Sequence, residues 1–397
     1  MSIDVIKLLS QMPSKEVSDL HLRVNMPPIY RIHGKLVPAL REFLSKEDME
    51  NLIHHILTEK QRQRFDEEWE LDMGLNVPTG ERFRVNIYRE RGTPGIAFRL
   101  VSAQVPDFNE LNLPNILKKL STQPRGLLLV TGVTGSGKST TLASMIDFVN
   151  RNKGVNILTI EDPIEYVHTN RRSIIAQREI GGDCRSFAMG LRQALRQDPD
   201  VILVGEIRDA DTMSIALSAA DTGHLVMSTL HTLDSLQTIY RILSFFPPHQ
   251  HQEIRHLLSS TLQAVISQRL VPRSDKPGRV PAVEILIGTG AVRECIVDSS
   301  KTTSIRDLIS EGASQYGMQS YDQSLMWFYQ NGAISLELAL ENSTNPDDFK
   351  LRVDGVLSGS DRGWAEFAAT QSDVSHEENE NSIKKSKKSR GDKSSDA

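Results

Sequence analysis

The stretch GLLLVTGVTGSGKS, residues 126–139, decides the fold of this chain. It opens with an uninterrupted apolar run, which is typical of a strand buried on both faces of a parallel sheet. From Gly132 to Ser139 it matches the pattern G-x4-G-K-[ST], and the following TLASMIDFVN, residues 141–150, predicts a helix. A strand, this loop and a helix in that order form the context in which the motif binds phosphate.

The loop predicts a nucleotide site, because each residue type has a role in holding phosphate. Glycines let the backbone curl until several N–H groups point at phosphate oxygens, and the helix N-terminus adds the positive end of a dipole. Lys138 neutralises the β and γ phosphates, while the Ser139 hydroxyl is a ligand for Mg²⁺. The predicted nucleotide-binding residues are Gly132, Thr134, Gly135, Ser136, Gly137, Lys138, Ser139 and Thr140. The loop alone does not separate a kinase from an ATPase.

Further apolar runs follow the loop, and they alternate with helical segments. VNILTIE, VILVGE and HLVMST begin at Val155, Val201 and His224, with segments such as FAMGLRQALRQ and ADTMSIALSAADTG between them. This order predicts an α/β domain built on a parallel sheet. VPAVEILIG, residues 280–288, predicts one more strand. Residues 301–350 predict helices that stop at Gly312, Gly317 and Gly332.

Residues 1 to about 100 predict a small mixed domain. Alternating apolar and polar residues indicate half-buried strands over 18–24, 28–37, 81–91 and 95–101. Ser45 is the predicted N-cap of a helix, with Asp48 three residues on. In the stretch from 81 to 91, Phe83, Val85 and Ile87 face one way, and Arg82, Arg84, Asn86 and Tyr88 face the other.

Carboxylates follow two of the predicted strands. Glu161, Asp162 and Glu165 come just past one strand, at the edge where ligands bind in open α/β sheets. Glu206 ends the next apolar strand and can orient a water or bind Mg²⁺ through one. The alternatives are an acidic, solvated turn for the first group and a glutamate paired with Arg208 for the second.

Two histidines, His224 and His231, bracket the strand HLVMSTLHT. Seven residues of strand span roughly 23 Å, so these two side chains cannot share one metal ion. For either histidine, the better functional interpretation is a polar side chain that contacts the γ-phosphate. Arg82 and Arg84 share a strand face and can reach a neighbouring subunit's γ-phosphate as arginine fingers, or they form an ordinary solvated face.

Composition excludes several classes of protein. The 397 residues carry 24% charged and 39% hydrophobic residues, with a net charge of −5, so no basic field attracts nucleic acid. Cys184 and Cys295 cannot build a disulfide framework or a four-cysteine zinc site. No secretory signal is evident, and no apolar run approaches the roughly 20 residues needed to cross a bilayer. The expectation is a cytoplasmic globular protein.

The motifs together resemble those of the secretion ATPase superfamily. The phosphate loop, TIEDPIEY, DPDVILVGEIRD and AADTGHLVMSTLHT are similar to its Walker A, Asp box, Walker B and His box, in the same order. SDLHLRVNMPPIYRIHGKL near the N-terminus, SIRDLISE and GMQSYDQSL resemble the type IV pilus retraction ATPases, the PilT and PilU family. The resemblance covers about Ser18 to Lys350.

This resemblance implies a PAS-like N-terminal α+β domain followed by a RecA-like P-loop ATPase domain with C-terminal helices. The implied boundaries are 1–100 for the first domain, 101–116 for a linker, 117–290 for the ATPase core, 291–358 for the helical part and 359–397 for a disordered polar and basic tail. The resemblance also implies a homohexamer that is peripheral to the inner membrane at the pilus base. Its hydrolysis of Mg-ATP would act on the pilus through an inner-membrane platform protein.

The resemblance also implies roles for residues. Glu206 and Glu165 are the implied catalytic residues, and Glu161 and Asp162 complete the Asp box. The implied His box is His224 and His231, the arginine-finger candidates are Arg84 and Arg99, and Ser139 is the Mg²⁺ ligand.

Some features depart from the family pattern and keep alternatives open. Val133 replaces a common proline in the phosphate loop, and Ser304 and Asp307 change the SIRDLISE stretch. The alternatives are an accessory retraction ATPase that works beside a sister motor, and an assembly or type II secretion ATPase, which usually carries a four-cysteine zinc motif. The net charge of −5 disfavours a motor that acts on nucleic acid. The basic run at residues 384–390 is a solvated tail or a contact for anionic lipid or nucleic acid.

Overall fold

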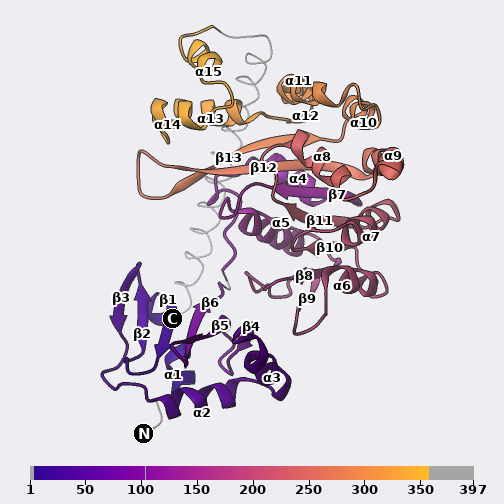
Figure 1. The fold of residues 1–397 in the computed structure, drawn as a ribbon. Helices are drawn as coiled ribbons and strands as arrows, with labels where there is room; N and C mark the ends of the chain where they lie inside the picture. Colours follow the sequence, from indigo (N-terminus) through magenta and orange to yellow (C-terminus); the bar gives the residue numbers. More distant parts are fainter. Residues whose placement is uncertain (1–3, 103, 357–397) are drawn as a thin grey trace, which may run out of the picture. The chain divides into compact units, whose positions relative to one another are not determined.

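The computed structural model describes residues 4–102 and 104–356, which divide into two compact units (Figure 1). Among the described residues, the first unit comprises 4–102, 104–105, Thr159–Thr169 and Ile175–Gly190, and the second comprises Pro106–Leu158, Asn170–Ile174 and 191–356. The domain boundaries drawn from the sequence stay a prediction. The predicted tail, residues 359–397, lies outside the described residues.

The N-terminal part of the first unit is a helix-covered antiparallel sheet with the strand order β3-β2-β1-β6-β5-β4. Its elements are α1 (Val5–Ser10), η1 (Pro13–Lys15), β1 (Val17–Arg23), β2 (Ile29–Ile32), β3 (Lys35–Pro38), α2 (Lys46–Ile56), α3 (Glu59–Glu68), β4 (Glu70–Asn76), β5 (Arg82–Glu90) and β6 (Thr93–Leu100). Ser45 caps α2 through two reciprocal hydrogen bonds with Asp48. The Asp48 N–H donates to Ser45 Oγ at 3.1 Å, and the Ser45 N–H donates to Asp48 Oδ2 at 2.9 Å.

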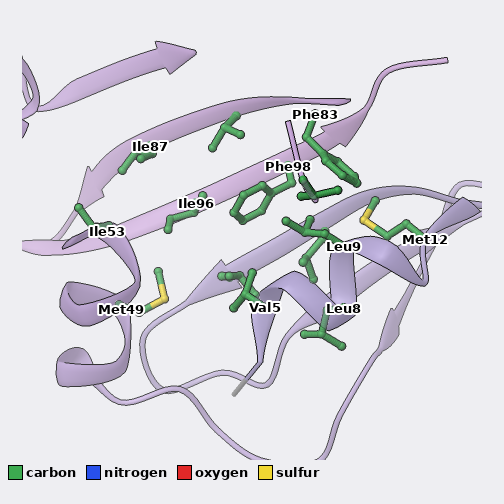
Figure 2. Packing of buried hydrophobic residues seen from close by; sticks show 14 of the residues in the cluster. Val5, Leu8, Leu9, Met12, Met49, Ile53, Phe83, Ile87, Ile96 and Phe98 are labelled. Atoms are coloured by element: carbon green, nitrogen blue, oxygen red, sulfur yellow. The ribbon is translucent and has the colours of Figure 1, made fainter. Parts of the chain in front are cut away.

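One face of this sheet forms a hydrophobic core against α1 and α2 (Figure 2). Phe83 and Ile87 of β5 are fully buried, as the alternation predicts, and they face Leu9 of α1 and Met49 of α2. Fully burying a side chain of this size stabilises the fold by about 1.5–3 kcal/mol. The opposite face of the sheet therefore carries polar residues, among them Arg82 and Arg84 of β5.

The single strand predicted over 28–37 is wrong, because the chain turns back at His33 and Gly34. Strands β2 and β3 pair directly across this turn, with Ile32 opposite Lys35. His33 and Gly34 have φ values of 47° and 81°, so both adopt the left-handed conformation. A two-residue loop with positive φ at both positions is the tight hairpin turn whose twist suits antiparallel strands.

The remaining elements alternate strands with helices, as predicted for an α/β domain. They are α4 (Ile116–Ser121), β7 (Gly126–Thr131), α5 (Lys138–Asn152), β8 (Asn156–Glu161), β9 (Ile174–Glu179), α6 (Phe187–Ala194), β10 (Val201–Val204), α7 (Ala210–Asp221), β11 (Leu225–Leu230), α8 (Ser235–Ser244), η2 (Pro248–Gln250), α9 (His251–Thr261), β12 (Leu262–Pro272) and β13 (Arg279–Ile287). The C-terminal elements are α10 (Gly290–Val297), η3 (Thr302–Ser304), α11 (Ile305–Glu311), α12 (Ala313–Tyr316), α13 (Tyr321–Gln330), α14 (Leu336–Asn342) and α15 (Pro346–Val353).

The second sheet has the strand order β13-β12-β7-β11-β10-β8-β9. Strands β12, β7, β11 and β10 run parallel, which confirms the predicted parallel sheet. Strand β12 had no predicted counterpart, and β13 runs antiparallel to it at the sheet edge. The carboxyl ends of β7, β11 and β10 lie along one edge, because parallel neighbours end on the same side.

The helix stops in the C-terminal region are where the glycines predict them. Gly312 caps α11 and Gly317 caps α12, the latter with a φ of 76°. Gly332, with a φ of 70°, follows α13. Among residues 4–102 and 104–356, none of the helices has the length and apolar character that crossing a bilayer requires.

Candidate active site

The phosphate loop connects β7 to α5 and depends on its glycines in two ways. Gly132, Gly135 and Gly137 have φ values of 144°, 79° and 90°, a region that side chains with a Cβ rarely adopt. At Gly132 space is also limiting, since an added Cβ would lie 2.3 Å from the Gln268 carbonyl oxygen. The loop can therefore expose its N–H groups only because glycines stand at these positions.

The side chains of the loop fit a bound phosphate. Lys138 is 8% exposed, and its Nζ donates to the carbonyl oxygens of Gly132 and Val133, both at 2.9 Å. Its ammonium therefore lies against the loop. The Ser136 hydroxyl is buried without a hydrogen-bond partner, as a group that awaits an acceptor would be. Ser139 is exposed at the first turn of α5, where a hydroxyl can reach a metal ion held by phosphates.

Gln268 on β12 holds the loop in place, a role that the sequence around it does not predict. Its side chain is 3% exposed. Its Nε2 donates to the Ser136 carbonyl oxygen and its Oε1 accepts from Thr141 Oγ1, both at 2.8 Å. One amide thus joins the loop to the helix that follows it. A polar residue inside the apolar run of 262–272 was the available signal, but the partners lie more than a hundred residues earlier in the chain.

Glu206 and His231 come together at the same sheet edge as the phosphate loop. Glu206 follows β10 and His231 follows β11, and β11 lies between β10 and β7. The Glu206 side chain is 13% exposed, with Oε1 2.5 Å from Arg208 Nη2 and Oε2 3.5 Å from His231 Nε2. The pairing with Arg208 that the sequence offered as an alternative is thus present. The Arg208 guanidinium and the His231 imidazole therefore orient the Glu206 carboxylate from two sides.

His224 lies at the other end of β11, so one strand separates it from His231. Its Nδ1 is 2.9 Å from the Ala219 carbonyl oxygen. A strand of this length spans about 20 Å, so the two histidine side chains lie too far apart to bind the same metal ion. No group of three or more His, Cys, Asp or Glu side chains suited to a metal ion occurs within the described parts of the chain.

The acidic segment, residues 161–166, belongs to the first unit. Glu161 ends β8, and its carboxylate accepts hydrogen bonds from Thr159 Oγ1 at 2.6 Å and Gln177 Nε2 at 3.2 Å. Desolvation raises the pKa of Glu161 above its ordinary value, against the effect of these two bonds. Asp162 and Glu165 are exposed. The segment therefore has one hydrogen-bonded carboxyl group with a raised pKa, Glu161, and two exposed carboxylates, Asp162 and Glu165.

The arginine-finger candidates also belong to the first unit. Arg84 of β5 and Arg99 of β6 are directly opposite each other across the strand pair, on the polar face of the sheet. Arg99 Nε donates to Asp19 Oδ1 at 2.8 Å, while 70% of the Arg99 side chain stays exposed. Burial raises the pKa of Asp19, but hydrogen bonds from Ser18 and Arg99 outweigh it and hold the pKa below its usual value. Arg99 is thus anchored at one end, and Arg84 is exposed beside it.

Comparisons with known proteins give consistent matches. Residues 5–322 match the family described as type II/IV secretion system protein. The chain is 43% identical over 347 residues to the type IV pilus retraction ATPase PilT of Pseudomonas aeruginosa, which covers 87% of this chain and 100% of that protein. It is 38% identical over 347 residues to the type IV pilus ATPase PilU of the same organism, covering 87% and 92%.

A solved structure gives the same result at the level of the fold. The crystal structure of the pilus retraction motor PilT with bound ADP matches with a TM-score of 0.79 and 41% identity. The match covers 87% of this chain and 98% of that one. The phosphate loop, the acidic segment and Glu206 all lie within the stretch that matches the family.

Proposed function

This chain belongs to the type II/IV secretion system protein family and is an ATPase, and from that premise we propose that it powers the retraction of type IV pili. The resemblance inferred from its motifs is confirmed by the relatives at 43% and 38% identity. One observation carries the proposal: the alignment with the PilT protein extends over 100% of that protein. The similarity therefore includes the N-terminal sheet as well as the ATPase motifs.

In this proposal the phosphate loop binds ATP. The backbone of residues 132–137 and the first turn of α5 hold the phosphates, and the Lys138 ammonium contacts their oxygens in place of the two loop carbonyls. Gln268 keeps the loop in the shape that this requires. Mg²⁺, when bound, neutralises phosphate charge, and Ser139 is its proposed protein ligand.

Glu206 is the proposed general base. Its carboxylate is held between Arg208 and His231 at the edge where β10 and β11 end, so its orientation is fixed before a water arrives. His231 beside it is the proposed γ-phosphate contact. Glu165 on the acidic segment is the second proposed catalytic carboxylate, since it is exposed, with Glu161 and Asp162 as its neighbours in the Asp box.

The motor is proposed to be a homohexameric ring peripheral to the inner membrane, on the cytoplasmic side of the pilus base. Arg84 and Arg99 are proposed to stabilise charge on a γ-phosphate, which their exposed position on the polar sheet face allows. An inner-membrane platform protein is the proposed partner through which ATP hydrolysis acts on pilin subunits.

A second candidate function is an accessory retraction ATPase that works beside a sister motor. The 38% identity to a PilU protein over 347 residues favours it, because that relative is nearly as similar as the PilT protein. Both candidates require the same phosphate loop and Glu206, so the ATPase chemistry does not distinguish them.

Deleting the gene and counting surface pili separates these candidates. A primary retraction motor predicts cells with excess pili that no longer twitch, and restoring the gene reverses both effects. An accessory motor predicts loss of twitching only when load is high or when the sister ATPase is weakened. Bald cells would contradict both candidates and identify an assembly ATPase.

A further inference from the structure

A buried carboxyl group on the edge strand of the second sheet, Glu284 of β13, bonds the start of helix α8. Glu284 is 9% exposed, and its Oε1 accepts from the Ser235 N–H at 2.8 Å. Ser235 is the first residue of α8 and is fully buried. Burial raises the pKa of Glu284, and the hydrogen bond from the Ser235 N–H acts against this rise. The first N–H groups of a helix have no partner within it, so Glu284 satisfies one that water does not reach.

Glu284 lies in a row of paired residues that crosses the sheet just before the phosphate loop. Thr131, the last residue of β7, pairs with Leu230 of β11 on one side and with Ser267 of β12 on the other, and Ser267 pairs with Glu284. Thr131 Oγ1 donates to Ser267 Oγ at 2.9 Å. Directly opposite residues of an antiparallel pair share a face, so these three polar side chains lie on one face of the sheet.

The histidine segment, residues 231–235, leads from the end of β11 to α8. Helix α8 packs against β12 and β13, while β11 lies on the other side of β7, so the segment passes the end of β7, where the phosphate loop begins. His231 is its first residue and Ser235 is its last. The bond from Ser235 to Glu284 therefore holds the end of the segment that lies away from His231.

A second buried group bonds the same segment. The Tyr321 hydroxyl of α13 donates to the Leu233 carbonyl oxygen at 2.8 Å, and Tyr321 is 2% exposed. The Arg269 guanidinium of β12 lies 4.1 Å from the centroid of the Tyr321 ring, a cation–π contact that fixes the ring. Glu284 and Tyr321 thus bond two backbone groups of the segment, two residues apart.

The position of His231 depends on the backbone of this segment. Its Nε2 lies 3.5 Å from Glu206 Oε2, longer than an ordinary hydrogen bond, and 51% of its side chain is exposed. Neither this contact nor packing is therefore sufficient to fix the imidazole. We propose that Glu284 is a positioning residue for ATP hydrolysis, which together with Tyr321 fixes the histidine segment and so keeps His231 beside Glu206.

This inference rests on the proposed function, in which Glu206 is the base and His231 contacts the γ-phosphate. Removing the Glu284 acceptor leaves the buried Ser235 N–H without a partner, so the segment shifts to satisfy it. Turnover should then slow. ADP has no γ-phosphate, so its binding does not involve His231 and should stay unchanged. A residue that only stabilised the fold would not separate turnover from ADP binding in this way.

Glu284→Ala and Glu284→Gln form a matched pair in the purified full-length protein. Alanine removes the acceptor, whereas the amide of glutamine keeps one acceptor oxygen for the Ser235 N–H. We expect Glu284→Ala to lower kcat for ATP about tenfold and to leave the dissociation constant of a fluorescent ADP analogue within about twofold of wild type. Hydrogen exchange of the Ser235 amide should accelerate about tenfold in the same variant. Glu284→Gln should restore both kcat and the slow exchange.

Tyr321→Phe tests the second anchor with a smaller change. It removes only the hydroxyl that bonds Leu233 and should also lower kcat without changing ADP binding. Tyr329→Phe is the control, because it removes a hydroxyl from the same helix at a half-buried position and should turn over like the wild type. The effect of Glu284→Ala on kcat should largely disappear in a His231→Ala background, because coupled residues are not additive.

Wild-type turnover in Tyr321→Phe would overturn the inference if Glu284→Ala either turns over like the wild type or does not fold. An equal fall in kcat from Glu284→Ala with and without His231 would also overturn it, as would a loss of ADP affinity that matches the loss of turnover. Pili that still retract after the gene is deleted would instead refute the proposed function. That result would leave these measurements on the purified enzyme unchanged, so the two failures are distinct.

Discussion

Replacing Gln268 with alanine asks whether β12 sets the shape of the phosphate loop. The Gln268 amide is buried and bonds the Ser136 carbonyl oxygen and Thr141 Oγ1, both at 2.8 Å. Alanine removes both bonds at once and leaves these two groups of the loop and of helix α5 without their partner. The substitution reaches the loop through Ser136 without replacing any residue proposed to contact phosphate.

The expected magnitude follows from the two lost bonds. A buried polar group left without a partner costs about 1–3 kcal/mol, and the space left by the side chain admits water that recovers part of the loss. We expect the free energy of unfolding to fall by about 2–3 kcal/mol. If half of this acts on the loop conformation that binds phosphate, the dissociation constant for ADP rises about tenfold, since each tenfold change corresponds to about 1.4 kcal/mol.

The assay is titration with a fluorescent ADP analogue beside a urea melt. Gln263→Ala is the matched control, because Gln263 lies on the same strand but packs beside Gly126 rather than the loop. Gln268→Glu keeps an acceptor for Thr141 and loses the donor to Ser136, so it should weaken ADP binding with a smaller loss of stability. Wild-type affinity in both Gln268 variants would refute the idea that β12 shapes the loop.

Three further predictions concern other parts of the chain. Lys138→Ala removes the cation proposed to contact the phosphates, so nucleotide binding and hydrolysis should both be lost, and unchanged turnover would refute the assignment of the loop. Asp19 has a folded-state pKa below its ordinary value of 3.8, so its stabilising effect is present above about pH 4 and is lost as the pH falls through the folded-state pKa. The urea midpoint of the wild type should therefore exceed that of Asp19→Asn at pH 6 and approach it near pH 3, and a constant difference would contradict this. Removing residues 360–397 should leave the ATPase rate unchanged, and a collapse in folding or in oligomer size would show that the tail has a structural role.

Features encoded by neighbouring residues could be predicted from the sequence. The phosphate loop, the Ser45 cap and the burial of Phe83 follow from patterns within about ten residues, because helix caps, turns and strand alternation are local. The hairpin at His33 and Gly34 was missed although it is local, because alternation continues through the turn and conceals the reversal.

Features that join distant segments could not be predicted. Gln268 bonds a residue 132 positions earlier, and Glu179 bonds Arg82 across 97 positions. Gln268 is marked only as a polar residue within an apolar run, and Glu179 has no local pattern that marks it, since a Gln or Glu within a strand is compatible with many environments. Strand β12 shows the same limit, because it follows α9 directly with no glycine or proline to separate them.

The most direct test of the account is to watch labelled pili in cells that carry Glu206→Gln in place of the wild-type residue. Purified Glu206→Gln should bind ADP like the wild type and hydrolyse ATP slower by orders of magnitude, because only the proposed base is lost. In cells, pili should then extend and not shorten. Pili that retract at the wild-type rate in these cells would contradict the claim that ATP hydrolysis by this chain drives retraction.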